Sequence, residues 1–328
     1  LLHGLTDSPY SLRSLGERFA DEGYAVVGLR LPGHGTVPEA LDRVRRRDWQ
    51  AAVRIAARAT AAMAPEGGPF VIVGYSNGAA LGLDYALATL DDPGLPRPDR
   101  LIMVSPAVGI TAFAAVAGLP RALRFVPLAD GLRWNSVVPE IDPFKYGSFP
   151  ANAAYQTHKL TVANRRRVAG LASNGRAGEL PPILAFVSLA DSTVKMESIA
   201  ADLMMPLADP RNEMVVFDVN RQADIIALFG DDPVSRLAWL AEQAPVPWTF
   251  TAITNEGPQS RAVVEKRWQG GEEEPTTRAL GLEWPASIYS LSHVALPFPP
   301  DDPLYGAVDD PERSWGLPLG SLEPRGER

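Results

Sequence analysis

The stretch Val71-Ile72-Val73-Gly74-Tyr75-Ser76-Asn77-Gly78-Ala79-Ala80 decides the fold. A short apolar run ends in Gly-x-Ser-x-Gly, and further small residues follow. This pattern predicts a nucleophile elbow, in which a buried strand delivers Ser76 to a sharp turn and a helix leaves from that turn. Glycines at 74 and 78 suit this layout, because strand and helix nearly touch there. A chance match in a loop is the alternative, and the flanking strand and helix patterns argue against it.

The composition is that of a globular protein with ordinary amounts of apolar and charged residues. The chain has 328 residues, of which 46% are hydrophobic and 21% charged. Its net charge is -8, and no long basic patch points to a nucleic-acid partner. The absence of cysteine excludes disulfides, thiolate metal sites and a cysteine nucleophile. With four histidines and no His-Glu-x-x-His pattern, we expect neither a metal site nor a cofactor.

The first residues read as the end of a strand rather than its beginning. Leu1-Leu2 is apolar and runs directly into His3-Gly4. We therefore expect N-terminal strands of the core to be missing, and any signal peptide or lipid anchor with them, so the localisation is unknown. No apolar run reaches the roughly 18–20 residues that a membrane-spanning helix needs.

Apolar runs alternate with helical patterns along much of the chain. The predicted strands are Tyr24–Leu31, Pro69–Val73, Leu101–Val104, Pro182–Ser188, Met214–Val219 and Trp248–Thr254. Such alternation predicts an α/β fold with a mostly parallel central sheet flanked by helices. Ligands bind beyond the carboxyl ends of the strands in such sheets, and Ser76 lies at one of these ends.

The alternation stops between Pro106 and about Leu180, where apolar helical residues, aromatics and prolines follow one another. We expect a core of residues 1–106 and 181–300, an inserted helical cap of residues 107–180, and an irregular tail of residues 301–328. Extra core packing without substrate contact is the alternative for the cap. Residues 257–280 are expected to form a loop or hairpin, and the strand order after residue 220 stays open.

A serine hydroxyl needs a general base to act as a nucleophile at neutral pH. His3 and His34 lie in glycine turns before Ser76, and His158 lies in the predicted cap. His293 follows a predicted short strand near the C-terminus. In hydrolases with this elbow the chain order is serine, acid, histidine, which favours His293 as the base.

The acid and the oxyanion donors are inferred from their places at strand ends. Asp191 follows a strongly apolar strand between Ser76 and His293, and it is favoured over the rivals Asp218 and Asp224. An oxyanion hole needs two backbone N–H groups. We expect them from Asn77, directly after the nucleophile, and from Leu5. Gly4 would let that early loop approach closely, and His3 would support it.

Together these motifs resemble the α/β-hydrolase fold, within its serine carboxylesterase and monoacylglycerol-lipase-like group. The resemblance rests on His3-Gly4-Leu5-Thr6, Pro32-Gly33-His34-Gly35, Asp48-Trp49, Gly74–Gly78, Asp191 and His293. It covers roughly residues 1–110 and 180–195 together with the histidine loop. The chain departs from the group in having Asn77 after the serine, where many relatives have Met or Leu. It also departs in the 102 residues between Asp191 and His293, which indicate an insertion.

The resemblance implies a serine hydrolase that cleaves carboxylic esters through an acyl-enzyme on Ser76, with a Ser76-Asp191-His293 triad. The apolar cap suggests a small-molecule ester with an apolar acyl chain, of the monoglyceride or lysophospholipid kind. Thioesterase, peptidase and acyltransferase activities need the same triad and remain open. A non-catalytic binding protein on a hydrolase scaffold is the alternative from a different class, and a covalent serine probe would distinguish it.

Overall fold

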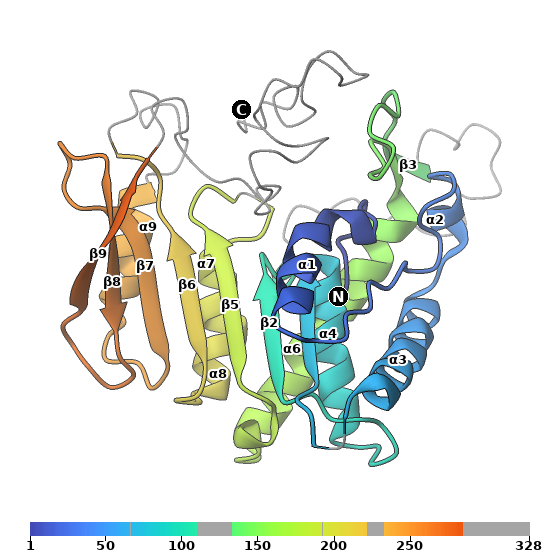
Figure 1. Ribbon diagram of the computed structural model, residues 1–328, viewed down its shortest axis with the longest axis horizontal. Helices are drawn as coiled ribbons and strands as arrows, with labels where there is room; N and C mark the ends of the chain where they lie inside the picture. Colours follow the sequence, from blue (N-terminus) through green and yellow to red (C-terminus); the bar gives the residue numbers. More distant parts are fainter. Residues whose placement is uncertain (66, 110–132, 192, 222–232, 285–328) are drawn as a thin grey trace.

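The computed structural model describes residues 1–65, 67–109, 133–191, 193–221 and 233–284 of the protein. In these residues a seven-stranded sheet forms the centre, with the spatial order β1-β2-β5-β6-β7-β8-β9 (Figure 1). Strands β1, β2, β5, β6 and β7 run parallel to one another, whereas β8 and β9 are added antiparallel. The strands of this sheet are β1 Val71–Tyr75, β2 Arg100–Val104, β5 Ile183–Ser188, β6 Glu213–Phe217, β7 Thr249–Asn255, β8 Ala262–Trp268 and β9 Thr276–Glu283.

The first two residues extend the sheet beyond β1. Leu2 forms parallel bridges to Gly74 on one side and to Leu29 on the other. The expectation of a buried strand over Tyr24–Leu31 is wrong, because this segment forms only the Leu29 bridge among the described residues, and Tyr24 is 38% exposed.

Helices cover both faces of the sheet, as the strand pattern predicts. The helical segments are η1 Pro9–Leu12, α1 Arg13–Asp21, α2 Ala40–Arg43, α3 Arg46–Met63, α4 Asn77–Thr89, α6 Ala151–Ser173, η4 Ala177–Glu179, α7 Met196–Ile199, η5 Ala200–Met204, α8 Met205–Leu207 and α9 Pro233–Ala241. Ile72 of β1 lies against Gly82 of α4, whereas Tyr75 packs with Leu12. Because alternate strand residues point to opposite faces, η1, which carries Leu12, lies on the opposite side of the sheet from α4, and α1 follows η1 directly (Figure 1).

Helix α4 is the most enclosed element of the described core. Every residue from Asn77 to Thr89 is buried. The sheet covers one side of the helix, and α3 and α6 pack beside it (Figure 1). The sequence of α4 is mostly apolar, with small residues in its first turn, and a helix that is apolar on every face is stable only when it is buried on every face. The apolar run after the predicted turn therefore becomes the centre of the helical layer.

Helix α3 starts at Arg46, and Asp48 lies in its first turn. Its carboxylate accepts a hydrogen bond from the N–H of Arg45 at 2.8 Å. The acidic side chain thus reaches back to a backbone donor that the helix leaves unpaired.

The part of the predicted cap that the structure describes includes a short hairpin and α6. β3 Trp134–Ser136 pairs with β4 Phe149–Pro150, and α6 follows directly. Helix α6 lies beside α4 in the helical layer (Figure 1). Residues 110–132 lie outside the described residues, and the cap over 107–180 stays a prediction.

The C-terminal part of the sheet resolves the strand order that the sequence left open. The predicted strand at Trp248–Thr254 is confirmed as β7. The polar stretch after it forms the hairpin β8–β9, which joins the main sheet. Helix α9 lies between β6 and β7 in the sequence, and the short strand predicted before His293 lies outside the described residues. No helix in the described ranges is long and apolar enough to cross a membrane.

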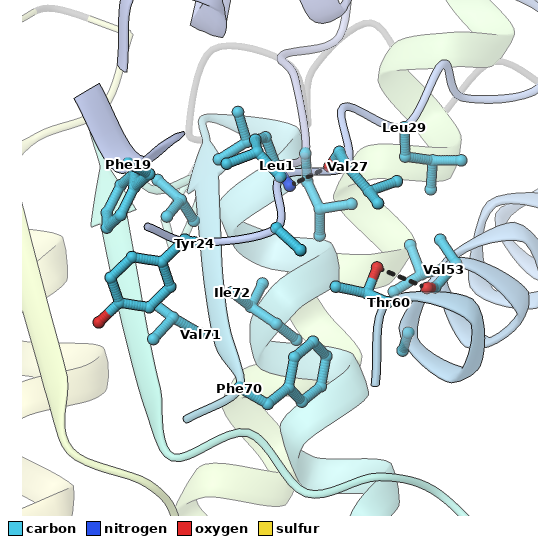
Figure 2. A pocket seen from close by; sticks show the side chains of 16 residues that line it. Leu1, Phe19, Tyr24, Val27, Leu29, Val53, Thr60, Phe70, Val71 and Ile72 are labelled. Carbon is cyan, nitrogen blue, oxygen red and sulfur yellow. Dashed lines mark hydrogen bonds between the residues drawn. The ribbon is translucent and has the colours of Figure 1, made fainter. Parts of the chain in front are cut away.

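A small apolar cavity of about 70 Å³ lies beside the start of β1 (Figure 2). Leu1, Phe19, Tyr24 and Val27 surround it on one side, with Ile72 on the other. Its lining carries no Asp, Glu, His, Lys or Arg side chain. Because it lies at the amino end of β1, it is remote from Ser76 at the carboxyl end, and we treat it as a packing feature.

Candidate active site

Ser76 occupies a strained turn between β1 and α4. Its backbone has φ 52° and ψ -114°, a left-handed φ that residues with a side chain rarely adopt. A Cβ on Gly74 would lie 2.5 Å from the backbone of Ala79, and one on Gly78 would lie 2.0 Å from the Leu2 carbonyl oxygen. Only glycine fits at both positions. The predicted strand, turn and helix are confirmed, and so is the reason for the two glycines.

Ser76 is also the one accessible residue of this region. Every residue from Ile72 to Thr89 is buried except Ser76, which is partly exposed. Its backbone N–H donates to the Val104 carbonyl at 2.9 Å, and its own carbonyl accepts from Ala80 and Ala107, each at 3.2 Å. The backbone therefore fixes the residue in place while the side chain remains open to a reactant.

The loop that carries Leu5 is held by its carbonyl oxygens. The Gly4 carbonyl faces Nδ1 of His3 at 2.8 Å, and the Leu5 carbonyl faces Nε2 of His34 at 2.7 Å. The Thr6 carbonyl accepts from the Tyr146 N–H at 2.8 Å. Three consecutive carbonyls are thus anchored. In the described part of the chain, neither the Leu5 N–H nor the Asn77 N–H donates a hydrogen bond, so both remain available.

Tyr146 is a supporting residue that sequence reasoning missed. Besides anchoring Thr6, its hydroxyl accepts from the Thr36 N–H at 2.9 Å and lies 3.3 Å from the Gly33 carbonyl. Its ring stacks over His34 with 6.1 Å between centroids. Tyr146 lies more than a hundred residues from these partners, so no local pattern could indicate the contact.

His3 and His34 are structural residues, as expected for His3. Nε2 of His3 accepts from the Leu31 N–H at 3.1 Å, which leaves Nδ1 to donate to Gly4. Burial, with His34 close by, lowers the pKa of His3 to about 3. Burial also lowers the pKa of His34, and both its ring nitrogens face backbone carbonyls. Neither imidazole has a ring nitrogen available to take a proton from Ser76.

Asp191 lies in a tight loop at the carboxyl end of β5. The side chain is fully buried, and its Oδ1 accepts from the N–H groups of Thr193 at 2.9 Å and Val194 at 2.8 Å. These two bonds fix the orientation of the carboxylate. Strand β2 lies between β1 and β5, so the ends that carry Ser76 and Asp191 are about 10 Å apart, two strand spacings. An imidazole hydrogen-bonded at both nitrogens spans roughly 8 Å, which suits a bridge between the two side chains.

An ion pair between neighbouring helices also stabilises the loop that carries Asp191. Arg236 of α9 forms a two-pronged ion pair with Glu197, at 2.6 and 2.9 Å, and donates to the Leu189 carbonyl. Although burial favours the neutral acid, this guanidinium holds the pKa of Glu197 below its ordinary value. The loop that carries Asp191 is therefore tied to α7 and α9.

The rival acid Asp218 is fully engaged elsewhere. Its Oδ1 accepts from the Val219 N–H at 2.8 Å. Its Oδ2 accepts from the Thr254 hydroxyl at 2.6 Å and forms an ion pair with Arg221 at 2.7 Å. Asp218 thus ties the end of β6 to β7, which fits a structural role. Asp224 lies outside the described residues.

His293, the predicted base, lies outside the described residues, so its role stays a prediction. His158 lies on α6, and no hydrogen bond joins it to Ser76 among the described residues. In the same part of the chain, no group of three or more His, Cys, Asp or Glu side chains is placed to hold a metal ion.

A cleft of about 750 Å³ begins beside the Leu5 loop. Thr6 and Asp7 line it on the loop side, and residues 143–146 line it on the other. Tyr10 and Phe144 stack across it, with 3.9 Å between ring centroids and 8° between ring planes. The cleft has the volume of a small-molecule site and combines aromatic surface with polar groups.

Comparisons with known proteins find hydrolases among the sequences that this chain resembles. The family model described as serine aminopeptidase S33 matches residues 1–208, a span that includes Ser76 and Asp191. The thermostable monoacylglycerol lipase of Bacillus sp. (strain H-257) is 29% identical over 194 residues, which cover 59% of this chain and 70% of that protein.

Two solved structures of lipolytic enzymes are also similar to this chain. One is described as a metagenome-derived lipolytic enzyme, with 22% identity, a TM-score of 0.49, and coverage of 73% of this chain and 90% of its own. The other is a soluble variant of monoglyceride lipase from Saccharomyces cerevisiae, with 11% identity, a TM-score of 0.48, and coverage of 66% and 75%.

Proposed function

The chain belongs to the serine aminopeptidase S33 family of α/β hydrolases, and from that premise we propose that it cleaves carboxylic esters through an acyl-enzyme on Ser76. The observation that carries the proposal is the exposure of Ser76. It is the one accessible residue between Ile72 and Thr89, and it is held at φ 52°. Strain of this kind is retained where the surrounding structure imposes it, and in this fold it presents a nucleophile.

In the proposed reaction the Ser76 Oγ attacks the ester carbonyl while His293 removes its proton. Asp191 orients the imidazole and stabilises its cation. The tetrahedral oxygen accepts hydrogen bonds from the N–H groups of Leu5 and Asn77. His293 then protonates the leaving alcohol, and a water activated by the same residue releases the acid and regenerates Ser76.

The electrostatic support for this scheme lies in the Leu5 loop and in the first turn of α4. The anchored carbonyls of residues 4 to 6 hold the Leu5 loop in a fixed conformation. The N–H of Asn77 belongs to the first turn of α4, where the helix dipole adds positive potential. Donors fixed in advance stabilise the charge of the transition state without reorganising.

The proposed substrate is a small ester with an apolar acyl chain, of the monoglyceride or lysophospholipid kind. The similarity to the monoacylglycerol lipase of Bacillus sp. supports this class. The cleft beside Leu5 supports it too, because aromatic rings and polar groups line a space large enough for such a molecule.

The test is a scan of p-nitrophenyl esters of increasing chain length, together with aminoacyl p-nitroanilides and acyl thioesters. We expect ester turnover with a chain-length optimum, and a loss of at least about 10³-fold in kcat/KM for Ser76→Ala. Preferred cleavage of the anilides or thioesters would reassign the reaction to peptide or thioester hydrolysis.

Ser105→Ala is the matched control for the serine. Ser105 also ends a strand of the sheet and also has a positive φ, of 42°, but it is buried. Alanine at either position keeps the positive φ of the serine that it replaces. The Ser105 variant should keep turnover within about twofold, whereas retained turnover in a folded Ser76→Ala variant would overturn the proposal.

A further inference from the structure

The residue after the nucleophile carries a polar side chain with few partners. The Asn77 side chain is fully buried. Its Oδ1 accepts a hydrogen bond from the Thr157 hydroxyl of α6 at 3.1 Å, and its Nδ2 has no hydrogen-bond partner among the described residues. A buried amide is costly unless it is hydrogen-bonded. Among the described residues, one hydrogen bond holds the side-chain amide of Asn77, and it comes from a residue 80 positions away.

We propose that Thr157 is a positioning residue for the oxyanion hole, which it serves by fixing the Asn77 side chain and with it the direction of the Asn77 N–H. This inference rests on the proposed function. Helix α6 lies directly against the first turn of α4, the helix that follows Ser76.

Helix α6 is a firm support for such a contact. Gln156, next to Thr157, accepts from the Arg46 N–H at 3.0 Å, and Asn152, five residues before Thr157, donates to the Leu41 carbonyl at 2.8 Å. Further along, Asn164 donates to the Ala80 carbonyl at 2.7 Å. The helix is thus fixed to α2, α3 and α4 at once, so the Thr157 hydroxyl is presented to Asn77 from a rigid surface.

The link from the side chain to the N–H is short. The Asn77 N–H donates to no acceptor in the described residues, so only the conformation of the Ser76–Asn77 peptide determines its direction. Without the Thr157 hydroxyl, the Asn77 amide would have no hydrogen bond in the described residues. It would then rotate toward another partner, and the contact between α6 and the first turn of α4 would weaken.

The predicted kinetic signature follows from where charge develops. An ester carbonyl acquires full negative charge on oxygen only near the tetrahedral transition state. A misaligned donor therefore reduces kcat and leaves KM nearly unchanged. Removing an oxyanion donor outright costs about 10²–10³-fold in kcat, so turning one aside should cost about tenfold.

The experiment measures kcat and KM on the preferred p-nitrophenyl ester for Thr157→Val and Thr161→Val. Both threonines lie on α6 and are buried to 2% and 3% exposure. The Thr161 hydroxyl donates to the His158 carbonyl of its own helix, at 2.9 Å, and so does not contact α4 through that bond. We expect about tenfold lower kcat for Thr157→Val with KM within about twofold, and unchanged values for Thr161→Val.

A second pair of variants tests the inference even where Thr157→Val does not fold. Thr157→Ser and Thr157→Ala both remove the methyl group, and only the serine keeps the hydroxyl. Serine should retain wild-type kcat and alanine should lose about tenfold. Equal kcat for the two, or an equal loss in Thr157→Val and Thr161→Val, would overturn the inference. If Ser76→Ala is inactive and Thr157→Val is normal, only this inference fails. If Ser76→Ala keeps turnover, the proposed function fails with it.

Discussion

The Ser76 elbow and the Asp191 loop lie two strands apart on the same sheet edge, yet they are held in different ways. Backbone atoms hold the elbow, in which β1, α4 and the Leu2 carbonyl meet with no space for a side chain at Gly78. Side chains hold the acid loop, through the Asp191 carboxylate and the ion pair of Arg236 with Glu197. A substitution that disturbs the backbone packing should therefore destabilise the whole elbow. A substitution in the Asp191 loop should remove one interaction and leave the others in place.

The largest effect should come from Asp191, and Asp218 is its matched control. Asp191→Asn keeps an oxygen for the backbone bonds but loses the charge that stabilises the imidazolium, so kcat/KM should fall about 10⁴-fold with the fold intact. Asp218→Asn breaks a buried ion pair and should cost about 3 kcal/mol of unfolding free energy, with kcat/KM within about threefold. Kinetics and urea unfolding of both variants measure this. The reverse pattern would make Asp218 the acid.

The next effect is the loss of stability expected when the backbone packing of the elbow is disturbed at Gly78. A Cβ at position 78 would meet the Leu2 carbonyl at 2.0 Å, whereas one at Gly170 on α6 would have nothing within 4 Å. Gly78→Ala should lower the free energy of unfolding by at least about 3 kcal/mol. Gly170→Ala should raise it by up to about 1 kcal/mol, because alanine favours a helix. Urea unfolding measures both, and equal stability of the two variants would contradict the account.

A smaller effect concerns pH. His3, which supports the Leu5 loop, has its pKa lowered to about 3 by burial, whereas an unfolded histidine titrates near 6.5. Below about pH 6.5 the unfolded chain binds a proton that the folded protein does not. The stability contributed by neutral His3 is therefore complete above that pH and is lost as the pH falls toward 3, by about 1.4 kcal/mol per pH unit.

Urea unfolding of the wild type and of His3→Asn at about pH 7 and about pH 5 measures this loss. The variant should lose less unfolding free energy between the two pH values, whatever its stability at neutral pH. An equal loss in both proteins would show that His3 is protonated in the folded state.

The sequence predicted the elbow well because its constraint is local. Gly-x-Ser-x-Gly after an apolar run describes a contact between residues four apart, and the structure shows the same contact. The position of Asp191 was also predictable, because the end of a parallel strand marks a sheet edge. Its two backbone bonds could not be predicted, since they depend on the loop conformation.

The sequence failed where structure depends on distant partners. The run from Tyr24 to Leu31 has the composition of a buried strand, but in the described residues it forms a single bridge, from Leu29 to Leu2. The hairpin expected at residues 257–280 does form, but its pairing with the edge of β7 could not be predicted from the sequence. The Thr157–Asn77 contact joins residues 80 positions apart, and only the packing of α6 on α4 brings them together.

The most direct test of the central claim is labelling of the folded wild-type protein with a fluorophosphonate, followed by peptide mass mapping. The account predicts a single adduct on Ser76, which is lost in Ser76→Ala and retained in Ser105→Ala. A folded protein that forms no adduct, or forms it on another residue, would contradict the claim that Ser76 is an activated nucleophile.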